Sequence, residues 1–88
     1  MNRIKIKKRY VKRAIRVLRD KIKYRMKQKG PQSYASVHEA LGIIAEEYKE
    51  LIDAIQSNNR KHTMDEMIDV AVGCIFAYAC NEAGGLDS

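Results

Sequence analysis

The chain has 88 residues, of which 45% are hydrophobic and 32% charged, a composition typical of one small globular domain and not of a disordered segment. Its longest apolar run, from Val70 to Cys80, is eleven residues long, which is too short to cross a bilayer. No stretch near the start has the apolar core of a secretory signal, so we expect a cytoplasmic domain that spans residues 1–88. Cys74 and Cys80 lie six residues apart on different helix faces, which predicts two reduced, buried thiols.

The net charge of +6 conceals a division between two parts of the chain. Residues 1–29 contain fourteen Lys or Arg and one acid, Asp20, which gives +13. Residues 30–88 contain three basic and ten acidic residues, which gives −7. The sequence therefore predicts a basic amphipathic helical segment over residues 1–29, joined to an acidic helical hairpin over residues 33–83.

The basic segment has the hydrophobic period of a helix between Tyr10 and Met26. Ile4 and Ile6 alternate with lysines, so the first nine residues also fit a frayed or extended start. Gly30-Pro31 predicts the end of the helix, because glycine caps helix C-termini and proline prevents continuation. The apolar stripe consists of Val11, Ile15, Leu18, Ile22 and Met26.

A second helix is expected to begin at Ser36, since Glu39 follows at the spacing of a capping box. Ser33 is a second candidate for this N-cap. The polar residues 57–62 then predict a short loop, and with it a hairpin of antiparallel helices. The expected apolar stripe of the second helix is Val37, Leu41, Ile44, Tyr48, Leu51 and Ile55, supported by Ala40, Ala45 and Ile52.

The third helix is expected to begin near Thr63, with Glu66 as its capping-box partner, and to end near Glu82 before two glycines. Residues 70–80 are apolar on every face, which predicts burial on more than one side. Three helices of this length leave such a helix partly uncovered. We therefore expect an all-α fold of the four-helix-bundle type, completed by formation of a homodimer or homotetramer.

Carboxylates are arranged in two pairs on the hairpin, Glu47 with Glu50 and Glu66 with Asp69, each pair three residues apart on one helix face. Four acids gathered without a cation would repel one another. The residues therefore predict a site for a hard divalent cation such as Mg²⁺. Structural roles compete with this interpretation, because acids are common on exposed helix faces and Glu66 also suits a cap. Asp69 has the fewest alternatives, because it leads directly into the apolar run.

The depth of these carboxylates in the hairpin depends on where the chain turns. If the turn is centred on Arg60, Glu50 and Asp69 lie at similar depth, with Glu47 deeper and Glu66 nearer the turn. The two pairs are then offset by about one helical turn. Side-chain reach, helix tilt or an earlier end of the second helix would have to compensate for this offset.

The two motifs, Glu46-Glu47-x-x-Glu50 and Glu66-x-x-Asp69, resemble the EExxE…ExxD signature of the MazG-like, all-alpha nucleoside triphosphate pyrophosphohydrolases. The resemblance covers residues 36–78, about half of the chain. It implies that Glu47, Glu50, Glu66 and Asp69 bind Mg²⁺, or alternatively Mn²⁺. It also implies that Glu46 helps to activate water, so that Glu46, Glu47 and Glu50 take part in catalysis. The implied reaction converts a ribo- or deoxyribonucleoside triphosphate to the monophosphate and pyrophosphate.

Three interpretations of the basic segment remain open. It is a solvated helix that packs on the bundle, a source of cations for the triphosphate, or a nucleic-acid-binding surface over residues 3–29. Candidates for triphosphate contact are Arg16, Arg19 and Lys23, from the same or a neighbouring subunit, and His38 is a further candidate for substrate contact. The competing functions are therefore a Mg²⁺-dependent pyrophosphohydrolase, a non-enzymatic nucleic-acid-binding module and an inactive metal-binding bundle.

Overall fold

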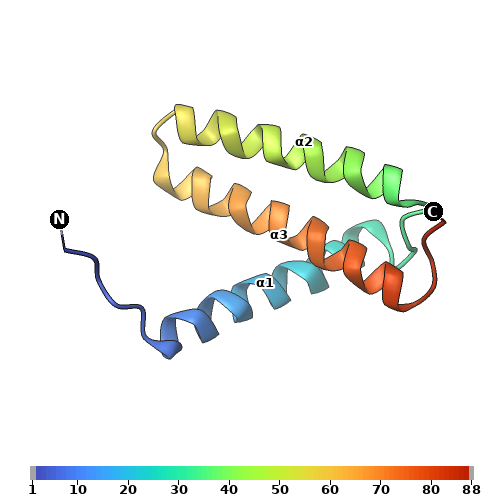
Figure 1. Ribbon diagram of the computed structural model, residues 1–88, viewed down its shortest axis with the longest axis horizontal. Helices are drawn as coiled ribbons and strands as arrows, with labels where there is room; N and C mark the ends of the chain where they lie inside the picture. Colours follow the sequence, from blue (N-terminus) through green and yellow to red (C-terminus); the bar gives the residue numbers. More distant parts are fainter. Residues whose placement is uncertain (1, 88) are drawn as a thin grey trace.

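The computed structural model describes residues 2–87 and contains three α-helices. These are α1 (Lys8–Lys29), α2 (Val37–Gln56) and α3 (Arg60–Glu82), and the part of the chain described contains no β-strand. In Figure 1, α2 and α3 lie side by side as an antiparallel hairpin, and α3 lies between α2 and α1. The predicted all-α fold is confirmed. No helix within residues 2–87 combines the length and the apolar character needed to span a membrane.

Helix α1 packs on α3 through only part of its apolar stripe. Leu18 and Ile22 are half-buried, whereas Val11 and Ile15 are 50% and 58% exposed. The helix ends at Gly30, whose φ of 83° lies in the left-handed region that favours glycine. Residues 2–7 are not helical, so the chain enters α1 from an extended start that projects away from the hairpin (Figure 1).

The expected start of α2 is confirmed in its atomic detail. The Ser36 side chain accepts a hydrogen bond from the backbone N–H of Glu39 at 3.1 Å. Ser33, the rival candidate, instead donates to the carbonyl of Tyr34 at 2.6 Å. Near the end of the chain, the Asp87 backbone N–H donates to the Ala35 carbonyl at 2.9 Å, which ties the C-terminal segment to the start of this helix.

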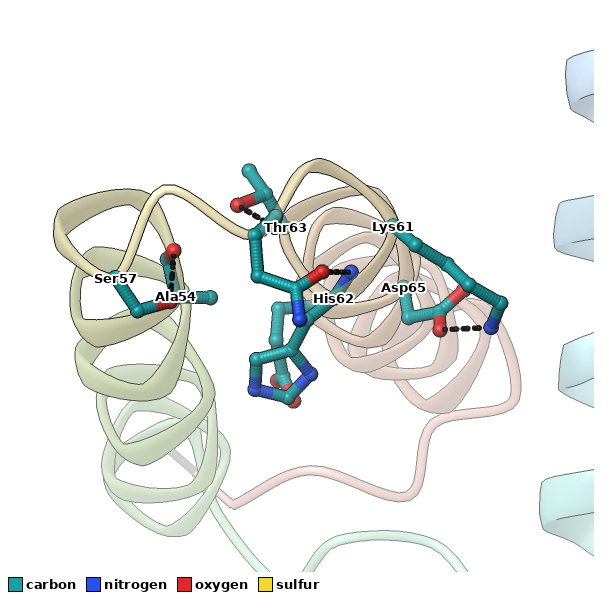
Figure 2. Close-up of polar contacts among 8 residues, drawn as sticks. Ala54, Ser57, Lys61, His62, Thr63 and Asp65 are labelled. Atoms are coloured by element: carbon teal, nitrogen blue, oxygen red, sulfur yellow. Dashed lines mark hydrogen bonds and ion pairs between the residues drawn. The ribbon is translucent and has the colours of Figure 1, made fainter.

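The expected start of α3 at Thr63 is wrong. The N-cap is Asn59, whose side chain accepts a hydrogen bond from the His62 backbone N–H at 3.0 Å (Figure 2). Thr63 already lies inside the helix, where its hydroxyl donates to the Asn59 carbonyl at 2.8 Å. Asn58 makes the turn with a φ of 58°, a conformation that asparagine tolerates. Glu66 is therefore beyond the first turn, and the capping role considered for it does not exist.

Replacement of the cap by Asn59→Ala is expected to lower the unfolding free energy by about 1 kcal/mol, because the His62 amide loses its acceptor. In a domain of this size that change corresponds to a decrease of roughly 4–8 °C in melting temperature. Thermal melts followed by circular dichroism would measure it. Asn81→Ala, an exposed site near the other end of α3, is the matched control and should change the melting temperature little. Equal effects of the two substitutions would contradict the cap assignment.

The core is small and lies where the α1–α2 loop, α2 and α3 meet. It consists of Tyr34, Ala40, Phe76 and Cys80, with the rings of Tyr34 and Phe76 in an edge-to-face contact at 5.1 Å. Gly73 lets the hairpin helices approach closely, since a Cβ there would lie 3.3 Å from the Ile44 side chain. This packing holds the middle of α3 against α2.

Burial of α3 on every side, which the apolar run predicted, is not found in the single chain. Ile75 and Tyr78 are 46% and 67% exposed, and Cys74 is exposed whereas Cys80 is buried. The buried face of α2 is also displaced toward one edge of its predicted stripe, because its buried residues are Ala40, a supporting member of that stripe, and Ala54, which was not predicted. Large apolar side chains remain exposed on both helices, namely Val37, Leu41, Tyr48, Ile52, Ile55, Met64, Met67, Ile75 and Tyr78.

Candidate metal centre

The position of the turn decides which carboxylates face one another. Asn58, not Arg60, lies midway between the last residue of α2 and the first of α3. Asn58 is eleven residues from both Glu47 and Asp69, and eight residues from both Glu50 and Glu66. The hairpin therefore places the two acidic pairs at the same depth. The earlier start of α3, at Arg60 and not near Thr63, removes the offset of one turn that a hairpin centred on Arg60 would produce.

The structure brings three of the four predicted ligands together. Glu47, Glu66 and Asp69 each offer a carboxylate oxygen, and these oxygens lie within 4.8 Å of one another. Glu50 is not one of the three, but its carboxylate is near enough for its negative charge to raise the pKa of the Glu66 carboxyl group. We call these four residues the carboxylate cluster.

Glu66 is the most buried acid of the cluster, with 9% of its surface exposed. Burial raises the pKa of its carboxyl group above the ordinary value of 4.5, and the negative charges of Asp69 and Glu50 raise it further. His62 opposes this effect, with its Nε2 3.8 Å from a Glu66 oxygen. Glu66 Oε2 is buried and has no hydrogen-bond partner within residues 2–87. Such an oxygen is costly to bury unless a proton or a cation satisfies it.

The pKa of Glu47, on α2, is raised for similar reasons. Burial raises the pKa of its carboxyl group, followed by the charges of Glu50, Asp69 and Glu66, while Lys29 of α1 lowers it. The two perturbed acids therefore belong to different helices and respond to the same concentration of negative charge. An arrangement of this kind is typical of functional sites.

The donor set fits a hard divalent cation. Mg²⁺ and Mn²⁺ prefer oxygen ligands, and the cluster supplies only carboxylates, one of them with an unsatisfied buried oxygen. The cation would also neutralise the repulsion that raises the pKa values of Glu47 and Glu66. The residues present thus suit the metal that the two motifs predicted.

Other predicted site residues lie away from the cluster. Glu46 is exposed and outside the group of three carboxylates. His38 is exposed in the first turn of α2, about 14 Å along the helix axis from Glu47. The exposed side chains of Arg16, Arg19 and Lys23 do not line the cavity next to the cluster.

That cavity has a volume of about 220 Å³ and lies between α1 and the hairpin. Glu47 and Asp69 form part of one wall. The basic residues opposite are Lys21, Arg25 and Lys29 of α1, none of which was among the predicted site residues. Their spacing of four residues could have identified them from the sequence, because it places all three on one side of a helix.

Arg25 is held in the cavity by aromatic rings. Its guanidinium carbon lies 3.6 Å from the centre of the Phe76 ring and 5.2 Å from that of Tyr34. Arg25 Nη1 and the Tyr34 hydroxyl are both buried and lack hydrogen-bond partners in the described chain. A cation and a hydroxyl group with unused hydrogen-bonding capacity therefore face the same cavity as the carboxylates.

Comparison with known proteins agrees with this geometry. The sequence model of the family described as phosphoribosyl-ATP pyrophosphohydrolase matches residues 11–86, which include both acidic motifs and nearly all of the three helices. Searches of curated proteins and of solved structures found no match. The matched family is part of the MazG-like all-alpha nucleoside triphosphate pyrophosphohydrolase superfamily, so the resemblance is confirmed at that level. The chain belongs to the phosphoribosyl-ATP pyrophosphohydrolase family.

Proposed function

We propose that the protein hydrolyses a nucleoside triphosphate or a related nucleotide to the monophosphate and pyrophosphate, with Mg²⁺ as cofactor. The observation that carries this proposal is the pairing of three carboxylates within 4.8 Å of one another with a basic wall across one small cavity. Carboxylates for a metal and cations for phosphate oxygens are what phosphoryl transfer requires, since catalysis there depends on position and charge. Family membership makes pyrophosphate release the expected reaction.

The cluster residues would hold the metal with unequal roles. Glu47 and Asp69 line the cavity, so their carboxylates would face the substrate, whereas Glu66 is the most buried and would anchor the site. Glu50 would add its negative charge beside Glu66, and Glu46 remains a proposal for a water-activating group at the exposed edge. Bound Mg²⁺ would supply positive charge to the phosphate oxygens and a lowered pKa to the attacking water.

The residues of α1 would bind the phosphate chain from the other side. Arg25 is orientated by Phe76 and Tyr34, and Lys21 and Lys29 add charge along the same wall. The Tyr34 hydroxyl would donate a further hydrogen bond. These contacts would place the α-phosphorus, with the oxygen that bridges it to the β-phosphorus, against the carboxylate side. Orientation of this kind lowers the barrier without any covalent role for the protein.

The proposal is tested by incubating the protein with a nucleotide panel and measuring pyrophosphate release. The panel contains the common ribo- and deoxyribonucleoside triphosphates and phosphoribosyl-ATP, each with Mg²⁺, with Mn²⁺ and with EDTA. We expect one or more members to be cleaved only when a divalent metal is present. An intact panel under all three conditions would refute the enzymatic function.

Arg25→Ala is expected to lower kcat/KM about 10- to 100-fold, because a charge-assisted contact to phosphate contributes roughly 1.5–3 kcal/mol. Steady-state kinetics measure this effect, and Arg25→Lys should recover part of it. Arg16→Ala is the matched control on the same helix, since Arg16 does not line the cavity. A larger loss in Arg16→Ala than in Arg25→Ala would assign the phosphate contact to a different face of α1. Thermal melts of both variants separate a kinetic effect from loss of Arg25 packing on Phe76.

We also infer that a second copy of the chain covers the exposed apolar side chains of α2 and α3. The cavity of about 220 Å³ is smaller than the pockets that enclose most ligands, so it accommodates phosphate groups but leaves the nucleoside outside. A neighbouring subunit would supply the remaining contacts. Light scattering after gel filtration should give a dimer or a larger assembly, and Tyr78→Glu, at a 67% exposed apolar site, should shift it toward monomer. A monomeric wild-type protein would contradict this inference.

A further inference from the structure

Helix α1 carries a second set of cations that the proposed function does not use. With about 100° of rotation per residue, eight basic side chains fall within an arc of roughly 140°. All eight are exposed. We call this arc the outer basic face; it consists of Lys8, Arg9, Lys12, Arg13, Arg16, Arg19, Lys23 and Lys27.

The outer basic face is separate from the wall of the cavity. Lys21, Arg25 and Lys29, which line the cavity, are centred roughly 170° away around the helix axis from the middle of the outer basic face. The apolar stripe that packs on α3 lies beside the cavity-lining set. Substrate phosphates held in the cavity would therefore contact a different side of α1.

The charges of the outer basic face are not neutralised within the protein. The ion pairs of the described residues are Lys61 with Asp65 and His62 with Glu66, both inside α3. Asp20, the one acid in α1, lies within the same arc but has no ion pair among the described residues, so the face keeps a large net positive charge. The extended residues before the helix add Arg3, Lys5 and Lys7, and Figure 1 shows this segment directed away from the hairpin. So dense a positive charge repels itself unless a polyanion or counterions compensate it.

We propose that the outer basic face and the extended segment before it bind the phosphodiester backbone of nucleic acid without sequence specificity. The 22 residues of α1 extend over about 33 Å, close to the length of one turn of duplex DNA. Contacts to phosphates would release condensed counterions, which is the main source of non-specific affinity. Tyr10, with the guanidinium groups of Arg9 and Arg13 at 5.1 and 5.7 Å from its ring, offers a flat surface beside these cations.

An anionic membrane fits this surface less well. Membrane-binding helices insert an apolar face between lipids, whereas the outer basic face consists of charged residues with only Met26 at its edge. The apolar stripe is on another side of α1, centred about 110° away; Leu18 and Ile22 are half-buried against α3, whereas Val11 and Ile15 stay exposed. A rigid, regularly spaced polyanion therefore matches the surface better than a bilayer does.

Fluorescence anisotropy of the full chain with a labelled duplex of about 24 base pairs, across a salt series, tests the proposal. If about six cations contact phosphates, log K should fall with log salt concentration with a slope of about −5. The triple variant Arg9→Gln/Lys12→Gln/Arg16→Gln should weaken binding at least tenfold and reduce the slope by about 3, at roughly 0.9 per contact. Labelled RNA duplex and single-stranded DNA in parallel show which form of the backbone binds best.

The matched control is Lys49→Gln/Arg60→Gln/Lys61→Gln, which removes the same net charge from the hairpin. It should change the affinity less than threefold. Asp69→Asn should leave binding intact, so that the result is independent of whether the protein is an enzyme. Three outcomes would overturn the proposal: no duplex binding at about 10 µM protein in low salt, equal losses in both triple variants, or binding to phosphatidylserine vesicles without binding to nucleic acid.

Discussion

Asp69→Asn is expected to reduce pyrophosphate release by about 100- to 1000-fold while leaving the fold intact. The substitution preserves the shape of the side chain but removes the charge of a carboxylate that both belongs to the cluster and lines the cavity. A neutral amide is a weaker ligand for a hard cation. Loss of several kcal/mol of charge stabilisation in the transition state corresponds to a rate effect of about this size. Pyrophosphate release at saturating nucleotide, with circular dichroism to verify helicity, measures it.

Asp53→Asn is the matched control for this prediction. Asp53 is an exposed acid on α2 outside the cluster, so the same chemical change there should leave the rate within about twofold of wild type, as for surface substitutions in general. Glu46→Gln tests whether Glu46, which is exposed in this structure, helps to activate water as the family resemblance implies. Retained activity in Asp69→Asn, together with a correctly folded protein, would remove the carboxylate cluster from the mechanism.

The acidic motifs could be recognised in the sequence because their spacing is local. Residues three apart share a helix face wherever that helix is placed, so the pairing of Glu47 with Glu50 and of Glu66 with Asp69 followed directly. Their relative depth depended on the turn. Asn59 and Thr63 are both good N-cap residues and lie four positions apart, on the same helix face, so periodicity alone does not separate them. The hydrogen bond from His62 to Asn59 decides between them.

The basic wall of the cavity could not be assigned in the same way. Lys or Arg occupies half of the positions of α1, on several of its sides, and which of them face the cluster depends on how α1 crosses α3. That crossing depends on tertiary contacts, including the stacking of Arg25 on Phe76, and not on any local pattern. Exposure of Cys74 and Tyr78 has a similar origin, since an apolar run shows that a helix can be buried but not which of its faces a single chain covers.

The stability of the metal-free protein should fall as the pH rises from 4.5 to neutrality through the titration of Glu47 and Glu66. Burial and neighbouring carboxylates raise both pKa values above 4.5, so the folded state binds more protons than the unfolded state in this interval. The contribution of these two groups to stability is therefore largest below the ordinary pKa of 4.5, and it is lost as the pH rises through their raised pKa values. At neutral pH, Mg²⁺ should take the place of the protons.

Addition of Mg²⁺ at 100 times its dissociation constant should therefore stabilise the protein at pH 7 by about 2.7 kcal/mol, or roughly 10–20 °C in melting temperature.

Glu66→Gln should have opposite effects on stability in the absence and in the presence of Mg²⁺. Without metal, this substitution should raise the melting temperature at pH 7, because a neutral amide is not repelled by the charges of Asp69 and Glu50. With Mg²⁺, the variant should lose most of the stabilisation that the metal gives to the wild-type protein. Melting curves of wild type and variant from pH 4.5 to 7.5, with EDTA or Mg²⁺, give both results. Glu82→Gln, at an exposed position on α3, controls for the change in net charge. Parallel pH profiles for wild type and Glu66→Gln, with equal responses to Mg²⁺, would show that Glu66 is neither strained by its neighbours nor a ligand.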